Sequence, residues 1–210
     1  MQGEAQKRSH LIVHIIDDNE ANRNLLQDLM DSADLQWCSH VSAMEFLEIF
    51  NPEAAGCLVL DVRMPRFNGM QLLEKLKTDG VDVPVILATA HGDVPMAIQA
   101  MKQGAFDFHE KPINTNAVLE SVYRAIDHRM QQLHEAGCIA SIQNNFAALT
   151  PREIDVYRLV VSGAMNKQIA FELDISQRTV EVHRAKVMEK MGARNLAELI
   201  KKHIALHGND

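Results

Sequence analysis

The chain has 210 residues, 47% of them hydrophobic, and a formal net charge of −7. This length allows one large domain or two modest ones, each with its own core. The apolar runs are too short to cross a membrane, and residues 1–10 (MQGEAQKRSH) form a tail that lacks the apolar segment of a secretory signal. The sequence therefore predicts a cytoplasmic protein with no membrane partner.

The acidity belongs to the first part of the chain. Residues 1–130 contain 11 Lys and Arg against 19 Asp and Glu, a balance of −8, whereas residues 131–210 contain 10 against 9, a balance of +1. A slightly basic second part is compatible with nucleic-acid contact but does not demonstrate it.

The cysteines Cys38, Cys57 and Cys138 are odd in number and show no C-x-x-C spacing. Cys38 and Cys57 fall in strand-like runs. We therefore expect buried, reduced thiols rather than a metal or redox site.

Residues 11–130 alternate short apolar runs with amphipathic segments, which is typical of a parallel sheet covered by helices on both faces. We expect a five-stranded, doubly wound, flavodoxin-like α/β domain. Helix starts are marked by Ser42 with Glu45, which form a capping box, by Asp93, and by Asn114 or Asn116. The expected strands are the runs 11–16, 35–40, 57–60, 84–88 and 105–108.

The last helix of this domain extends beyond the core that it has to cover. Its apolar residues step by three and four as far as Leu133. Two interpretations stay open, a stiff connector or partner surface and simple frayed amphipathicity. Because Gly137 and the Gln143–Asn145 run are typical of linkers, we assign residues 131–147 to a linker that is partly helical.

Residues 148–210 have helical patterns throughout and predict an all-α domain of four helices. The tetrapeptide TPRE that begins at Thr150 supplies an N-cap, a first-turn proline and an acid at the third helical position. We expect Asn166 to cap a short second helix, Ser176 a longer third one and Asn195 the last. The short turn between the second and third helices is helix-turn-helix geometry.

Polar residues end the apolar runs of the first domain, at the edge where open α/β sheets bind ligands. Three carboxylates that meet there repel one another unless a hard cation or an ammonium lies among them. We predict a Mg²⁺ (or Mn²⁺) site at which Asp61 becomes an aspartyl phosphate, with Asp18 as a direct ligand and Asp17 acting through a water. Thr89 and Lys111 would hold phosphoryl oxygens. Taken singly, each residue is an ordinary turn, strand or surface residue, so the prediction depends on their joint occurrence.

The first domain contains Asp17-Asp18, LDVRMP (60–65) followed by Gly69, ATAHGDVP (88–95) and DFHEKP (107–112). With these motifs it resembles the receiver domain of bacterial two-component response regulators, most closely the FixJ subgroup. Residues 148–210 contain LTPRE (149–153), NKQIA (166–170), ISQRTVEVHR (175–184) and KMGA (190–193). With these motifs they resemble the LuxR-type helix-turn-helix domain.

The resemblance implies that a partner histidine kinase phosphorylates Asp61. It also implies a cis peptide bond before Pro112. Phe108 would be an aromatic switch that rotates inward with Thr89; core packing is a compatible role for this ring.

The resemblance further implies that the backbone carbonyl of Arg63 binds the metal. The side chains of Arg63 and His91 would then set how fast the phosphate hydrolyses. Phe67 and Asn68 stand where small residues are common in the family, and we expect a local loop difference there without loss of chemistry.

The implied protein is a regulator, not an enzyme, that pairs as a homodimer when phosphorylated and binds double-stranded DNA operators as an activator, with RNA polymerase as a further candidate partner. For His183, helix packing is slightly favoured over a phosphate contact. Base contacts are expected from Glu181, Val182 and Ala185, and phosphate contacts from Lys167, Thr179, Arg184, Lys186 and Lys190.

Two rival functions fit these residues less well. A Mg²⁺-dependent phosphohydrolase also uses an aspartyl phosphate, but it needs a second acid two residues after the nucleophile, where this chain has Arg63. A regulator that works unphosphorylated, by dimerisation alone, is disfavoured by the complete set of acids.

Overall fold

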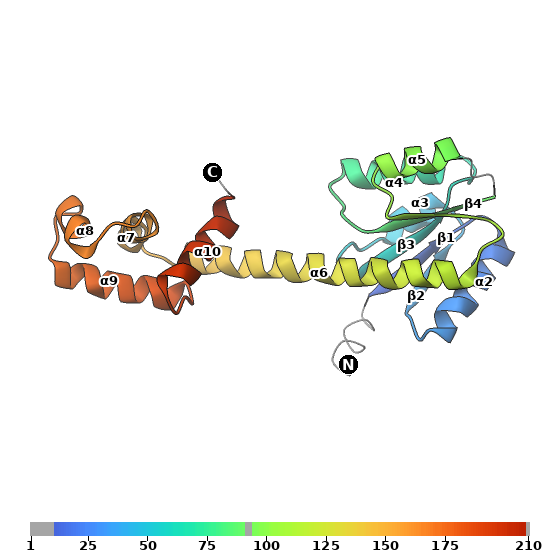
Figure 1. The fold of residues 1–210 in the computed structure, drawn as a ribbon. Helices are drawn as coiled ribbons and strands as arrows, with labels where there is room; N and C mark the ends of the chain where they lie inside the picture. Colours follow the sequence, from blue (N-terminus) through green and yellow to red (C-terminus); the bar gives the residue numbers. More distant parts are fainter. Residues whose placement is uncertain (1–10, 91–93, 209–210) are drawn as a thin grey trace. The chain divides into compact units, whose positions relative to one another are not determined.

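The computed structural model describes residues 11–90 and 94–208 (Figure 1). They form two compact units that divide between Gln132 and Leu133. The assigned tail of residues 1–10 lies outside the described part, as do His91 and the helix cap expected at Asp93.

The first unit is built on a five-stranded, wholly parallel sheet with the strand order β2-β1-β3-β4-β5. Helices cover both faces, as Figure 1 shows, so the predicted doubly wound receiver fold is confirmed. Its elements are β1 (Ile12–Ile16), α2 (Glu20–Ser32), β2 (Trp37–His40), α3 (Ala43–Ile49), β3 (Ala55–Asp61), α4 (Gly69–Thr78), β4 (Val85–Thr89), α5 (Val94–Lys102), β5 (Asp107–Glu110) and the start of α6 (Thr115–Ala147).

The central strands are apolar because both of their faces are covered. Every residue of β3 and of β4 is buried. On one face, Leu58, Leu60 and Leu87 pack with residues of α3, α4 and α5 in a single core cluster. This burial holds the polar residues that end β3 and β4 at a fixed position on the sheet's edge.

The helix starts follow local capping chemistry. The Ser42 hydroxyl accepts a hydrogen bond from the backbone N–H of Glu45 (3.2 Å). The Glu45 carboxylate bonds the N–H of Val41 rather than that of Ser42, so the expected capping box is displaced by one residue. Of the two candidates for the start of α6, Asn114 is the cap, since its side chain accepts from the N–H of Ala117 (3.2 Å).

Helix α6 runs without interruption from Thr115 to Ala147, so residues 131–147 are helical throughout rather than in part. Gly137 lies within it, and apart from the backbone of its own helical turns no described atom lies within 4 Å of where its Cβ would be. The buried residues of α6 end at Arg129, whose guanidinium donates to the carbonyls of Pro52 (2.8 Å), Ala55 (3.3 Å) and Asp82 (2.9 Å). Among the described residues, no helix is both long and apolar enough to cross a membrane.

The second unit contains α7 (Pro151–Val161), α8 (Asn166–Glu172), α9 (Gln177–Lys190) and α10 (Leu196–His207) after the end of α6. Tyr157 is the largest fully buried residue of its core. The caps expected at Thr150, Ser176 and Asn195 all form: each side chain accepts from the backbone N–H three residues on.

The prediction that Asn166 caps the second helix of this domain is wrong. The N-cap of α8 is Met165, and the Gln168 side chain accepts from the Met165 N–H (2.8 Å). The Asn166 side chain instead accepts from Arg184 of α9 (2.9 Å), a contact between helices that local sequence does not reveal.

The cysteines are free. Cys57 is buried as expected, but Cys38 is only half-buried and Cys138 is exposed.

Candidate functional site

Asp17, Asp18 and Asp61 meet at the carboxyl edge of the sheet. One carboxylate oxygen from each lies within 4.8 Å of the others. Asp17 follows β1 and is 2% exposed, Asp61 ends β3 and is 7% exposed, and Asp18 faces solvent. An all-oxygen, anionic and partly hydrated set of this kind fits the preferences of Mg²⁺.

Lys111 joins two of these acids. Its ammonium lies 2.6 Å from an oxygen of Asp17 and 3.0 Å from one of Asp61, and its side chain is only 10% exposed. A backbone hydrogen bond holds Lys111 in place, because its N–H donates to the carbonyl of Thr89 (2.7 Å). The peptide bond between Lys111 and Pro112 is cis, as the resemblance implied. The ammonium thus relieves the repulsion between Asp17 and Asp61.

Asp17 is further anchored by its own surroundings. Its carboxylate accepts from the N–H of Asn19 (2.9 Å) and from the amide of Asn22 (3.3 Å). Its carbonyl accepts from the guanidinium of Arg23 (2.8 Å). With these partners Asp17 is preorganised, while Asp18 is left facing outward.

Burial raises the pKa of Asp61 above its ordinary value, although the hydrogen bond and charge of Lys111 and the Arg63 N–H act in the opposite direction. The Arg63 N–H donates to the Asp61 carboxylate at 3.2 Å. A cation bound among the acids would favour the ionised, nucleophilic form of Asp61.

Gly69, which the sequence marks only as part of a motif, supports the loop that follows Asp61. Its N–H donates to the carbonyl of Val62 (3.0 Å), and a Cβ built at this position would lie 2.3 Å from the carbonyl oxygen of Asp61. Only glycine fits here without moving the backbone of Asp61. The preceding Phe67-Asn68 pair has a local role, since Asn68 forms a complete capping box with Gln71 at the start of α4.

Thr89 and Phe108 lie on neighbouring strands. Thr89 ends β4 and is fully buried. Phe108, on β5, is half-buried and packs against the core cluster under α3, α4 and α5. Thr89 therefore ends its strand at the same edge as Asp61, while Phe108 packs against the core, a role compatible with a switch.

A pocket of about 540 Å³ lies beside Asp18, the exposed acid of the cluster. It is lined by Asp18, Val62, Arg63, Met64, Pro65, Asn68, Met70 and Met96. Arg63 therefore lines the pocket beside Asp18, whereas His91 lies outside the described residues.

Helix α9 of the second unit has one buried and one exposed side. Val180 and Val187 are buried, as is Met191 directly after the helix. The opposite side exposes Glu181, Val182, Ala185 and Lys186, and Lys167 is exposed on α8.

Two of the basic residues assigned to DNA phosphates already have partners within the domain. Lys190 forms an ion pair with the buried Glu153 (2.6 Å) and also donates to the carbonyl of Ala148 (3.1 Å). Arg184 bonds Asn166, as described above. His183 is half-buried and its Nδ1 is a buried atom with no partner among the described residues, which is consistent with packing.

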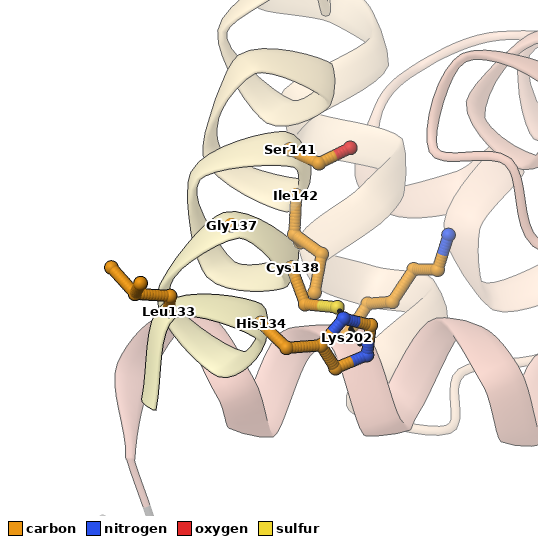
Figure 2. A pocket seen from close by; sticks show the side chains of 7 residues that line it. All are labelled: Leu133, His134, Gly137, Cys138, Ser141, Ile142 and Lys202. Atoms are coloured by element: carbon orange, nitrogen blue, oxygen red, sulfur yellow. Dashed lines mark hydrogen bonds between the residues drawn. The ribbon is translucent and has the colours of Figure 1, made fainter. Parts of the chain in front are cut away.

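A separate hollow of about 500 Å³ lies in the second unit, between the last part of α6 and α10 (Figure 2). Cys138 points toward His134 there, with its sulfur 3.7 Å from Nε2, and the Lys202 side chain reaches the same space. No acid lines this hollow, so its chemistry differs from that of the sheet edge.

Comparison with known proteins agrees with both units. Residues 13–123 match the family model of the response regulator receiver domain, and residues 147–203 match that of the bacterial regulatory proteins of the luxR family. The transcriptional regulatory protein FixJ of Azorhizobium caulinodans is 43% identical over 91% of this chain and 90% of its own. Nodulation protein W of Bradyrhizobium diazoefficiens is 37% identical over 95% and 88%. Among solved structures, the response regulator StyR matches with a TM-score of 0.85 and 37% identity, over 93% of this chain and 98% of that one.

Proposed function

The chain belongs to the FixJ-like two-component response regulators and is a transcriptional regulator with a receiver and a LuxR-type DNA-binding domain, and we propose that it is switched by phosphorylation of Asp61. The observation that carries this proposal is the convergence of three carboxylates with the Lys111 ammonium at one sheet edge. The donor is a phosphohistidine of a partner histidine kinase.

The residues divide the chemistry as follows. Asp17, Asp18, Asp61 and the Arg63 carbonyl hold Mg²⁺ or Mn²⁺, which when bound neutralises charge on the transferred phosphoryl group. A carboxylate oxygen of Asp61 attacks phosphorus; the P–N bond to the donor imidazole breaks, and its electron pair returns to that nitrogen. Lys111 remains beside Asp61 and holds a phosphoryl oxygen as a point charge.

The signal then leaves the site through β4 and β5. Thr89 moves to donate its hydroxyl to the phosphoryl group, and Phe108 turns into the space that this movement opens. Because Phe108 is only half-buried at rest, its ring can become more buried without dismantling the central core. The altered receiver surface favours a homodimer.

The dimer binds paired half-sites of double-stranded DNA in the cytoplasm and activates transcription, with RNA polymerase as a further partner. Glu181, Val182 and Ala185 read base edges, the carboxylate of Glu181 by accepting from a cytosine amino group. Thr179, Arg184, Lys186 and Lys167 contact phosphates. Lys190 does so only if its ion pair with Glu153 opens, so we rank it last.

The direct test is acetyl phosphate labelling of the Asp61→Asn chain in the presence of Mg²⁺. We expect no labelling and no phosphorylation-dependent dimer, with the circular dichroism spectrum unchanged. The matched control is Asp79→Asn, which removes an exposed carboxylate at the C-terminal end of α4 and should label normally. Labelling of Asp61→Asn at the wild-type level would mean that another residue is the acceptor.

The DNA contacts are tested separately with Glu181→Ala. Loss of this carboxylate should change base preference at one position of the half-site more than overall affinity. Lys186→Ala is the comparison, because a lost phosphate contact should weaken binding to all sequences and reduce its salt dependence. Unchanged base preference in Glu181→Ala would refute its role.

A further inference from the structure

A second cluster of metal-ligand side chains lies on the sheet, apart from the acids. It consists of His14 on β1 and of Cys38 and His40 on β2, the edge strand (Figure 1). In the parallel register His14 lies opposite Cys38, and Ile16 lies opposite His40. Because residues two apart on a strand point to the same face, all three side chains lie on the face that α3 covers.

The donor atoms are spaced as ligands of one ion would be. One ligand atom from each residue lies within 4.8 Å of the other two, and Nδ1 of His14 is 3.0 Å from Nε2 of His40. Tetrahedral zinc with Zn–N bonds of about 2.0–2.1 Å places two nitrogens roughly 3.3 Å apart. An ion therefore requires the two rings to separate by only a few tenths of an ångström.

A pair of buried imidazoles is an unusual contact for a protein core. His14 is 5% and His40 1% exposed, and the rings of Phe46 and Phe50 surround them on the side of α3. The two rings share a single hydrogen bond, and Nδ1 of His40 is buried with no hydrogen-bond partner among the described residues. Burying a polar group in an apolar layer costs free energy unless the group is hydrogen-bonded or binds a metal. Packing alone therefore does not explain this pair.

We propose that His14, Cys38 and His40 bind a transition-metal cation of the Zn²⁺ class, with an open fourth position. Two imidazoles and a thiolate are borderline and soft ligands, which select such ions over Mg²⁺. The half-buried Cys38 gives the ion a route from solvent, whereas both histidines are closed off. The site is thus chemically distinct from the oxygen ligands around Asp61.

Metal binding at this place would act on the strand that carries an acid of the phosphorylation site. The carbonyl of His40 accepts from the N–H of Asp17 (3.3 Å), and Asp17 directly follows β1. An ion shared by β1 and β2 fastens the edge strand to its neighbour three residues before Asp17.

The test is a titration of the full chain with Co²⁺ in excess Mg²⁺. We expect one ion per chain, the visible absorption of tetrahedral cobalt and a thiolate-to-cobalt charge-transfer band, which oxygen-only sites cannot produce. The Cys38→Ser chain, checked for folding by circular dichroism, should lose the charge-transfer band. The Cys138→Ser chain should keep it.

The Cys138→Ser chain decides the question even if Cys38→Ser does not fold. Cys57 is fully buried, so a thiolate band in that chain has to come from Cys38. Absence of the band from the wild-type chain overturns the proposal. Loss of the band in Cys138→Ser overturns it too, because the ion would then be held by Cys138, for which His134 is the neighbouring ligand.

Discussion

Replacing Lys111 by methionine removes the one ammonium that the structure places between Asp17 and Asp61. The chain length of the side chain is nearly kept, but the contacts of 2.6 Å and 3.0 Å to two carboxylates are lost. All three side chains are at most 10% exposed, so water cannot simply replace the ammonium. The two acids are left facing each other.

The size of the effect follows from these distances. At an effective dielectric constant of about 20, each contact is worth roughly 5.5–6.5 kcal/mol of Coulomb attraction before desolvation is subtracted. Breaking a buried pair by removing one partner costs about 3–5 kcal/mol net. We expect the receiver unit to lose about 3 kcal/mol without divalent cations. Mg²⁺ should recover more stability in this variant than in the wild type, because the cation supplies the missing positive charge.

Urea unfolding followed by tryptophan fluorescence measures this loss in the receiver alone. Trp37, the chain's single tryptophan, lies on β2, where its indole N–H donates to Asp31 (2.7 Å). With a urea slope of about 1–3 kcal/mol per molar, the midpoint should fall by about 1 M or more. The control is Lys75→Met, which breaks a 2.9 Å pair with Asp79 whose side chains are both 46% exposed. It should cost less than about 1 kcal/mol.

The reasoning fails if Lys111→Met and Lys75→Met unfold at the same urea concentration. It also fails if Mg²⁺ stabilises the Lys111→Met chain less than it stabilises the wild type. In either case the acids would not depend on the ammonium for their charge balance.

Three further predictions concern backbone fit, pH and the anchoring of α6. Gly69→Ala should impair phosphorylation and lower the urea midpoint, because its Cβ would collide with the Asp61 carbonyl at 2.3 Å. The control is Gly137→Ala, in open helical surroundings, which should raise stability by about 0.5–1 kcal/mol. Burial lowers the pKa of His14 to about 4, so the unfolded chain takes up its proton first as pH falls. The receiver should lose up to about 3 kcal/mol between pH 6.5 and pH 4 in urea titrations, and a His14→Phe chain that is equally acid-sensitive would contradict this. Arg129→Met should cost about 3 kcal/mol, since it strips donors from three carbonyls, and thermal melts equal to the wild type would refute the anchoring role.

The sequence predicts the sheet and the acid cluster well because both depend on short-range rules. Buried parallel strands are continuous apolar runs, and the first polar residue after each run has to lie at the sheet's edge. For this reason Asp17, Asp61 and Thr89 could be placed from their positions alone. Side-chain caps such as Ser176 are equally local, since donor and acceptor are three residues apart.

What local patterns could not supply are the contacts between distant elements. Asn166 has the right residue type for a cap, yet Arg184 competes for its side chain, and Gln168 satisfies the helix start instead. The charge of Lys190 favours a phosphate contact. In the structure, however, its ammonium binds the buried carboxylate of Glu153, which is 37 residues away in the chain. Gly137 favours a linker, but a single glycine lowers the stability of a long helix by only about 1 kcal/mol.

The pocket beside Asp18 is lined by three thioethers, those of Met64, Met70 and Met96. Unbranched methionine side chains change rotamer at little cost and adapt to surfaces of different shape. If Asp61 is phosphorylated as proposed, an adaptable lining of this kind would admit a free acyl phosphate as readily as a protein-borne imidazole. Fidelity toward one sensor would then reside in surfaces outside the pocket, where a cognate donor makes contacts that a small molecule cannot.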